Sequence, residues 1–188
     1  MIEDIFASRT QTRNFKKFDY PEENLVHSMI EKTFNIVPSK QNLMPYMIHV
    51  LGPSHYEYKK KLYKIVSNSS GGGNYGNTNV FAPYVLLFTC RLCFPNNFVS
   101  SKMHNDIHKF PACDAKKYSN RNPVAWLEMG MFSTILTGMC LEKGISVGYL
   151  RCFSNDLNDW KDIDFINDPV VYSMQLGYKE HEKHHFEK

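Results

Sequence analysis

The sequence has little of two features that would identify whole classes of protein: a strong net charge and a paired set of cysteines. Its 188 residues carry 22 Lys and Arg against 19 Asp and Glu. The resulting net charge of +3 is too small by itself to indicate a nucleic-acid-binding protein. The five cysteines are an odd number and give no disulfide framework, so we expect free thiols in a reducing compartment. The first residues, MIEDIF, are acidic where a secretory signal is basic and then apolar, so we expect a cytoplasmic location.

The length and the apolar content indicate one folded domain. With 43% apolar side chains the chain can bury a substantial core, and we expect a single domain over residues 1–188. Segment 94–121 mixes aromatic and polar residues, so it suits either a lid over a flat substrate or a surface excursion. Residues 179–188 are expected to form a C-terminal tail.

Four lysines lie close together in a stretch, 55–66, whose apolar residues have helical spacing. They could form a basic patch that binds a polyanion, or the solvated face of a helix. We expect the solvated face and no nucleic-acid partner. The four residues are Lys59, Lys60, Lys61 and Lys64.

A glycine-rich loop, GGGNYG, matches the letters of a dinucleotide-binding fingerprint at Gly71, Gly73 and Gly76. That fingerprint needs a strand before the glycines and a helix after them. Here the order is reversed, because 55–66 has helical spacing and 80–90 is a short apolar run typical of a buried strand. The loop is therefore predicted to turn the chain rather than to bind a nucleotide through this motif.

Two cysteines and two histidines have a spacing close to that of a zinc finger. They are Cys90, Cys93, His104 and His108, which spell C-x2-C-x10-H-x3-H. The segment lacks the hairpin and the amphipathic helix that such a finger builds. We therefore expect a cysteine pair at a strand end, two loop histidines and no metal site.

Hydrophobic periodicity and capping residues predict a set of helices and strands. Helices are expected at 2–8, 21–34, 55–66 and 123–143, and strands at 45–51, 80–90, 144–153 and 170–178. The helix at 21–34 is predicted to begin at Pro21, whose fixed φ suits a first turn. These elements fit either a doubly wound sheet or a mixed α+β arrangement, and periodicity alone leaves both open.

The helix expected at 123–143 is the clearest element. Asn122 can cap it, Pro123 suits its first turn, and Gly144 follows its last turn. Its apolar residues wrap nearly the whole circumference, which is typical of a helix buried on all sides. Because one short chain can hardly cover such a helix completely, we expect a homodimer. Glu128 and several hydroxyl side chains argue against a membrane span.

Two further stretches carry side chains suited to a ligand. In the first, arginines offer a forked and permanently charged donor to an anion. In the second, a turn before a strand can present hydroxyl and amide groups. Each stretch alone is also typical of a surface loop. The first is SRTQTRNF, with Arg9, Thr10, Gln11 and Arg13, and the second is VPSKQNLMPY, with Pro38, Ser39 and Asn42.

The order of these stretches along the chain forms a larger pattern. A short helix leads into S-R-x-x-x-R-x-F, and an amphipathic helix then leads into P-S-x-x-N-x-x-P-aromatic and a strand. Further on come Ala82-Pro83 before an apolar strand, the long helix, and the closing Leu176-Gly177-Tyr178. Over nearly its whole length, the chain resembles the FMN-dependent nitroreductase superfamily.

The resemblance implies an α+β fold in which a mixed, largely antiparallel central sheet is flanked by helices. It also implies an intertwined homodimer with FMN at the interface. The implied function is an FMN-dependent NAD(P)H oxidoreductase. Hydride passes from NADH or NADPH to flavin N5 and on to a nitroaromatic, a quinone or a similar small acceptor. No further catalytic side chain is required.

The resemblance also assigns roles to the two stretches. Arg9 would meet the FMN phosphate, Gln11 the ribityl side and Arg13 the pyrimidine edge, with Thr10 in the same motif. A cation at the pyrimidine edge would raise the reduction potential, because reduced flavin carries negative charge there. The residues that would approach the flavin from the other subunit are Pro38, Ser39 and Asn42.

Five more positions are assigned to the flavin site by their place in the pattern. Asn74, in the glycine-rich loop, would border the flavin. Arg151 and Cys152, at the strand end after the long helix, would lie near flavin N5, where many members carry an acidic residue or a glycine. Lys183 and His185 would clamp the phosphate, unless the tail is simply a disordered end.

Three alternative functions remain open. A flavin carrier or sensor without turnover would fit the absence of a lysine near Thr78 and of a glutamine at Met44, which family members often have. A specialised reductase, such as a dehalogenase, would fit Arg151 and a lid at 94–121. A polyanion-binding module would rest on the lysine run and would bind no flavin.

Overall fold

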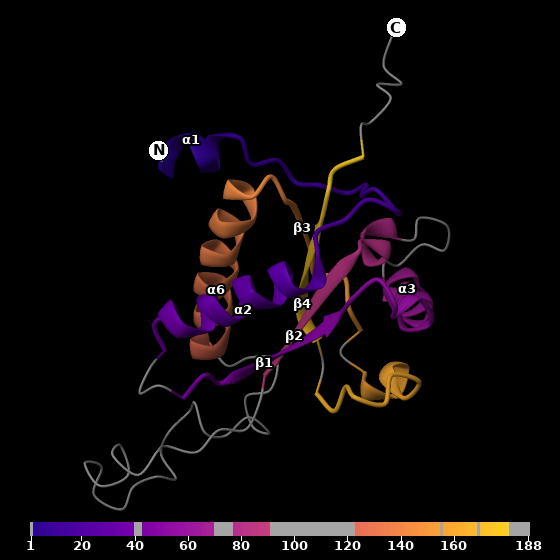
Figure 1. Ribbon diagram of the computed structural model, residues 1–188. Coiled ribbons are helices and arrows are strands. Elements are labelled where there is room, and N and C mark those ends of the chain that lie inside the picture. Colours follow the sequence, from indigo (N-terminus) through magenta and orange to yellow (C-terminus); the bar gives the residue numbers. More distant parts are fainter. Residues whose placement is uncertain are drawn as a thin grey trace, which may run out of the picture.

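The computed structural model describes residues 2–39, 43–69, 77–90, 123–154, 156–168 and 170–180 of the 188-residue chain. In this part of the chain, helices gather around a single sheet (Figure 1). Several sequence predictions fall outside the described residues and remain predictions. They concern Asn42, the GGGNYG loop with Asn74, Cys93, segment 94–121 with His104 and His108, and the tail residues Lys183 and His185.

The sheet has four antiparallel strands in the order β1-β2-β4-β3. A doubly wound arrangement is thereby excluded, because it requires parallel neighbours. The α+β class is confirmed, and the described strands include no parallel pair that would make the sheet mixed. The strands are β1 (Tyr46–Leu51), β2 (Tyr84–Cys90), β3 (Ser146–Leu150) and β4 (Val170–Gly177).

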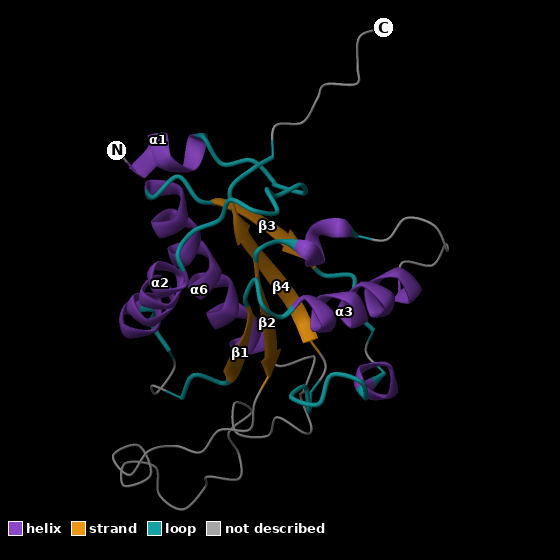
Figure 2. Ribbon diagram, turned by 45° about the vertical axis from the view of Figure 1, so that its right-hand side comes forward, coloured by secondary structure: helices purple, strands orange, loops and turns teal. Residues whose placement is uncertain are grey.

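Helices cover both faces of this sheet, with α2 and α6 on one face and α3 on the other (Figure 2). The short helix α1 packs against α6. The helices are α1 (Ile2–Ala7), α2 (Glu23–Ile36), α3 (Tyr56–Ser69) and α6 (Pro123–Glu142), with two 3-10 turns, η2 (Thr78–Phe81) and η6 (Leu157–Trp160).

Strand β2 lies at the centre, and all seven of its residues are buried. Leu86 and Phe88 belong to the core shared with α2 and α6, whereas Val85 and Leu87 belong to the core shared with α3. A strand covered on both faces reads as a continuous apolar run rather than an alternating one. The sequence YVLLFTC therefore reflects two separate cores, one on each face of the sheet.

The long helix α6 ends at Glu142, one residue before the predicted end. Gly144 follows it with a φ of +71°, a conformation that costs a side-chain-bearing residue energy, and Ile145 N donates to Cys140 O at 2.8 Å. Burial on all sides is not found in the single chain, because Leu127 is 64% exposed and Trp126 37%. One side of α6 is thus buried and the other is exposed and apolar.

By length and composition alone, α6 could cross a membrane, since Val124–Glu142 has a mean hydropathy of 1.4. In the fold it packs against α2, α1 and β3, and two of its hydroxyl groups have partners in the sheet. Ser133 forms a hydrogen bond with the Tyr172 hydroxyl, and Thr137 with the Tyr149 hydroxyl. These contacts are those of the core helix of an α+β domain.

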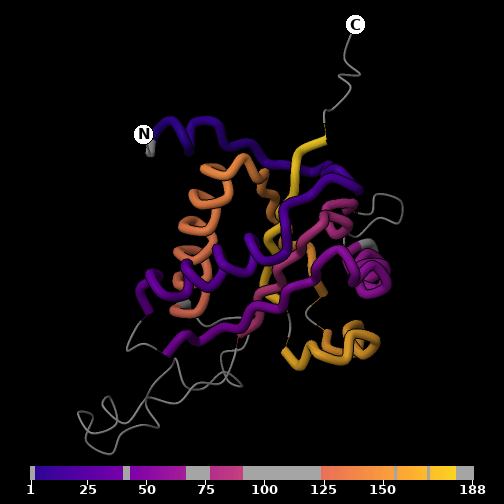
Figure 3. The backbone as a smooth tube through the Cα atoms, in the orientation of Figure 1, coloured from indigo at the N-terminus to yellow at the C-terminus, as the bar shows by residue number. Residues whose placement is uncertain are grey.

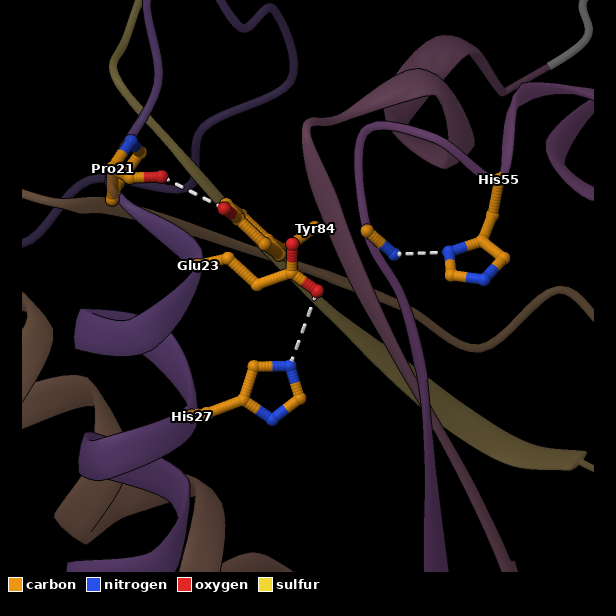
Figure 4. A network of polar contacts seen from close by, with 6 residues as sticks. Pro21, Glu23, His27, His55 and Tyr84 are labelled. Carbon is orange, nitrogen blue, oxygen red and sulfur yellow. Dashed lines mark hydrogen bonds and ion pairs between the residues drawn. The ribbon is translucent and has the colours of Figure 1, made fainter.

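The start of α2 differs from the prediction, because the helix begins at Glu23 rather than at Pro21. Pro21 is buried, and its carbonyl accepts a hydrogen bond of 2.8 Å from the Tyr84 hydroxyl (Figure 4). This contact fixes the chain to β2 immediately before the helix. In the same region Glu23 pairs with His27 at 3.6 Å, and His55 Nδ1 accepts from the Gly52 amide at 3.0 Å.

The strand expected over 80–90 is shorter than predicted, because η2 occupies its first residues. Between η2 and β2 the carbonyl groups of Ala82 and Pro83 both accept hydrogen bonds from Lys59 Nζ, each of 2.7 Å. These carbonyl groups are therefore satisfied by a side chain of α3 rather than by a neighbouring strand. The apolar run at 80–90 does not indicate from sequence alone that a lysine side chain bonds to two of its carbonyl groups.

The N-terminal segment and the end of β4 lie side by side, although they are far apart in sequence (Figure 3). Phe15 forms an antiparallel bridge with Lys179, and Lys16 N donates to Tyr178 O at 2.9 Å. Glu180 N donates in turn to Asn14 O at 3.1 Å. These bonds fix the segment that carries the predicted arginines.

Candidate functional site

The segment after α1 lies directly against β3. Thr12 N donates to Val147 O at 3.1 Å, and a Cβ placed on Gly148 would come within 2.4 Å of Thr12 O. Real side chains do not tolerate such an approach, so a residue without a Cβ is needed where the segment crosses the strand. Gly148 thus allows the segment that carries the candidate site to lie directly against β3.

This segment carries both buried and exposed side chains. Thr12 and Phe15 are buried, whereas Arg9, Gln11 and Arg13 are exposed. Thr10 is exposed as well. The two guanidinium groups and the amide between them are therefore presented on the outside of a segment whose backbone is fixed to the sheet.

Gln11 connects the segment to the second half of β3. Its side-chain Nε2 donates to Tyr149 O at 2.9 Å. The Tyr149 hydroxyl bonds to Thr137 of α6, and burial raises the pKa of Tyr149, while the charge of Arg9 and the Thr137 bond act in the opposite direction. Tyr149 was not predicted from the sequence as part of the candidate site. No motif around it distinguishes it from an aromatic residue that only packs in a strand.

Arg151 and Cys152 follow β3 directly, two and three residues after Tyr149. The Arg151 guanidinium lies over the ring of Trp126 at 5.0 Å from its centroid, a cation–π contact with the exposed side of α6. Cys152 is an exposed free thiol. Arg151 and Cys152 therefore lie at the end of the strand whose Tyr149 carbonyl accepts the hydrogen bond from Gln11.

Pro38 and Ser39 follow α2 in the chain. Ser39 Oγ accepts a hydrogen bond of 2.8 Å from the Met44 amide, shortly before β1. Pro38 lines a shallow groove of about 590 Å³ together with exposed residues of α6 that include Trp126 and Leu127. The groove lies along Trp126–Ile135, whereas α1 packs near Gly138 towards the other end of the helix.

The predicted site residues form two groups within one chain, which meet at Arg151. One group lies on the N-terminal segment and at the end of β3, and the other lies beside the apolar groove on α6. The Arg151 guanidinium lies over Trp126, which lines that groove. Four predicted residues belong to neither group because they lie outside the described residues. These are Asn42, Asn74, Lys183 and His185.

Lys59 corrects the prediction that the lysine run is a solvated face. Lys60, Lys61 and Lys64 are exposed, but Lys59 is only 3% exposed and its ammonium group contacts two backbone carbonyls. Burial lowers its pKa from 10.5 to about 8. Lys59 is the first residue of the lysine run, and its residue type does not distinguish it from the exposed lysines that follow it.

The zinc-like motif is tested only at Cys90, since its other three members lie outside the described residues. Cys90 is buried at the end of β2, and burial raises its pKa to about 12. Within the described ranges, no group of three or more His, Cys, Asp or Glu side chains could hold a metal ion.

No protein-family model and no curated protein match this sequence. Solved structures do match its fold. A nitroreductase from Desulfitobacterium hafniense with bound FMN aligns with a TM-score of 0.66 and 14% identity, covering 97% of this chain and 90% of that one. An NAD(P)H:FMN oxidoreductase from Staphylococcus epidermidis aligns with a TM-score of 0.68 and 15% identity, covering 98% and 89%.

A third similar structure is longer than this protein. The chain covers 65% of an oxidoreductase from Bacteroides fragilis, which in turn covers 94% of this chain with a TM-score of 0.64 and 16% identity. Identities at this level establish the fold alone. The nitroreductase-like fold that the sequence pattern predicted is thereby confirmed.

Proposed function

We propose that the protein is an FMN-dependent oxidoreductase that takes hydride from NADH or NADPH and reduces a small acceptor such as a nitroaromatic or a quinone. The fold and the similarity to FMN-binding structures support this assignment. The observation that carries it is the arrangement of Arg9, Gln11 and Arg13, exposed on a segment fixed to β3. Bound FMN would supply the redox chemistry at its ring, and the protein supplies position and charge.

The exposed side chains fit the two polar ends of FMN. Arg9 is a forked donor that suits the phosphate, and Arg13 is a fixed cation that suits the pyrimidine edge. Gln11 is held between them by its bond to Tyr149 O, so its position does not depend on the ligand. A backbone anchored before the ligand arrives reduces the entropy that binding costs.

We further propose that the protein acts as a homodimer whose partner covers the groove on α6. The exposed apolar side of α6, with Trp126 and Leu127, is what a second copy would bury. Pro38, Ser39 and Asn42 of the partner subunit would then approach the flavin held by the first.

The experiment begins with the purified protein. We expect a yellow protein, from which denaturation releases FMN that chromatography and mass spectrometry identify. We also expect NADH or NADPH oxidation that depends on an added quinone or nitroaromatic. Arg9→Ala should lose flavin, whereas Lys32→Ala on the exposed face of α2 should retain it.

Two outcomes would change the assignment. A yellow protein that oxidises neither nucleotide with any acceptor would favour a flavin carrier or sensor. A colourless protein that added FMN cannot reconstitute would exclude every flavin-based function proposed above. The cytoplasmic location, and the absence of nucleic-acid and membrane partners, remain predictions.

A further inference from the structure

A second hollow lies beside Arg13, Asn14 and Phe15 of the N-terminal segment. It has a volume of about 850 Å³, within the usual range for small-molecule sites. The N-terminal segment around Lys17 and Tyr20 forms one side of it. The start of α3, at Tyr56 and Lys59, and the turn from η2 to Pro83 form the other. We call this hollow the α3 cleft.

Exposed aromatic rings are concentrated at the α3 cleft. Phe18 is 95% exposed, Tyr56 53% and Tyr20 42%, and all three line it. Phe81 lies deeper, with its ring centroid 5.8 Å from that of Tyr56. Leaving several large rings in water is unfavourable, and rings that gather at one cavity are typical of a ligand site.

The charge of the α3 cleft is predominantly positive. Of the described residues that line it, Arg13, Lys17 and Lys59 are cationic and Glu180 is anionic. Lys59 is held in place by its bonds to the carbonyl groups of Ala82 and Pro83, both of which also line the cleft. A buried cation with a fixed position exerts a stronger field than a mobile surface lysine.

We propose that the α3 cleft binds a small aromatic anion, such as an aromatic carboxylate. The ring of the ligand lies against Tyr56 and Tyr20, and its negative charge faces Lys17 and Lys59. Of these four residues none was assigned to the flavin, and Arg13 alone is shared with the proposed flavin site. The inference therefore goes beyond the proposed oxidoreductase activity and does not depend on it.

Binding of matched probes to the full-length protein, as purified and after addition of FMN, tests the proposal by calorimetry. We expect 2-naphthoate to bind at least about tenfold more tightly than the neutral 2-naphthamide, because only the carboxylate gains charge-assisted contacts. Lys17→Gln should remove most of this difference and leave 2-naphthamide unaffected. Tyr56→Ala should weaken both probes by about tenfold, because stacking on the ring is lost for both.

A matched control and two contrary outcomes complete the test. Lys32→Gln, an exposed lysine of α2 that does not line the cleft, should change neither affinity. Binding of 2-naphthoate in strict competition with FMN would overturn the proposal, since the cleft would then be part of the flavin site. Equal affinities for the two probes, or no binding of either, would overturn it as well. Flavin content and nucleotide oxidation are measured separately, so failure here leaves the proposed function untouched.

Discussion

The buried ammonium group of Lys59 should make the stability of the protein depend on pH in the alkaline range. Its pKa is about 8 in the folded protein, against an ordinary value of 10.5, because burial disfavours the charged form. Between these values the unfolded chain binds more protons than the folded one, so the free energy of unfolding rises with pH. The stability that this group contributes is complete above the unfolded pKa and is lost as pH falls through the folded pKa.

The size of the effect follows from the shift. The difference between the folded and unfolded pKa of Lys59 corresponds to about 3 kcal/mol in the free energy of unfolding. About 2 kcal/mol of this increase should appear between about pH 7 and about pH 9.5. The neutral amine can still donate to the carbonyl groups of Ala82 and Pro83, so the local contacts need not be lost on deprotonation.

Urea unfolding at these two pH values, for the native protein and for Lys59→Met, measures the effect. The native protein should gain about 2 kcal/mol more than the variant on going to the higher pH. Lys64→Met removes an exposed lysine of the same helix and should retain the full gain. An identical pH response in the native protein and in Lys59→Met would refute the reasoning, whatever the absolute stability of the variant.

Three further predictions concern the site and the surface. Gly148→Ala should cost about 2 kcal/mol in thermal or urea unfolding, because its Cβ would collide with Thr12 O, and unchanged stability would contradict the close crossing. Arg9→Ala should weaken FMN binding by about tenfold or more in a fluorescence titration, as expected for the loss of a charge-assisted phosphate contact. Leu127→Glu should convert the proposed homodimer into a monomer in sedimentation analysis, because a carboxylate cannot be buried in an apolar interface, whereas a persistent dimer would place the interface elsewhere.

Much of the architecture could be predicted because its determinants are local. The helix α6 begins and ends where Pro123 and Gly144 indicate, since a residue of fixed φ and a residue that accepts positive φ act on their own neighbours. The central position of β2 follows from its unbroken apolar run. The role of the arginine-bearing segment in flavin binding, which rests on spacing within eight residues, stays a prediction.

The features that were missed depend on contacts between distant residues. Lys59 is buried because its ammonium group reaches carbonyl groups 23 and 24 residues further along the chain, a relation that periodicity does not encode. Tyr149 joins the candidate site because Gln11 donates a hydrogen bond to its carbonyl oxygen, 138 residues away. The exposed side of α6 could not be separated from its buried side, because both are apolar.

The order of the strands gives the N-terminal segment a structural role in addition to its proposed role in binding, because it covers an edge strand. Strand β3 lies at the border of the sheet, and open borders with unpaired amide and carbonyl groups attract strands of other molecules. Through its bond to Val147, the chain around Thr12 shields part of that border. Deletion of the N-terminal segment would therefore expose main-chain amide and carbonyl groups of β3 and should promote self-association. A related protein that does not bind the proposed ligand would still need this segment to cover β3. Only the outward-facing side chains of the segment would be free to change.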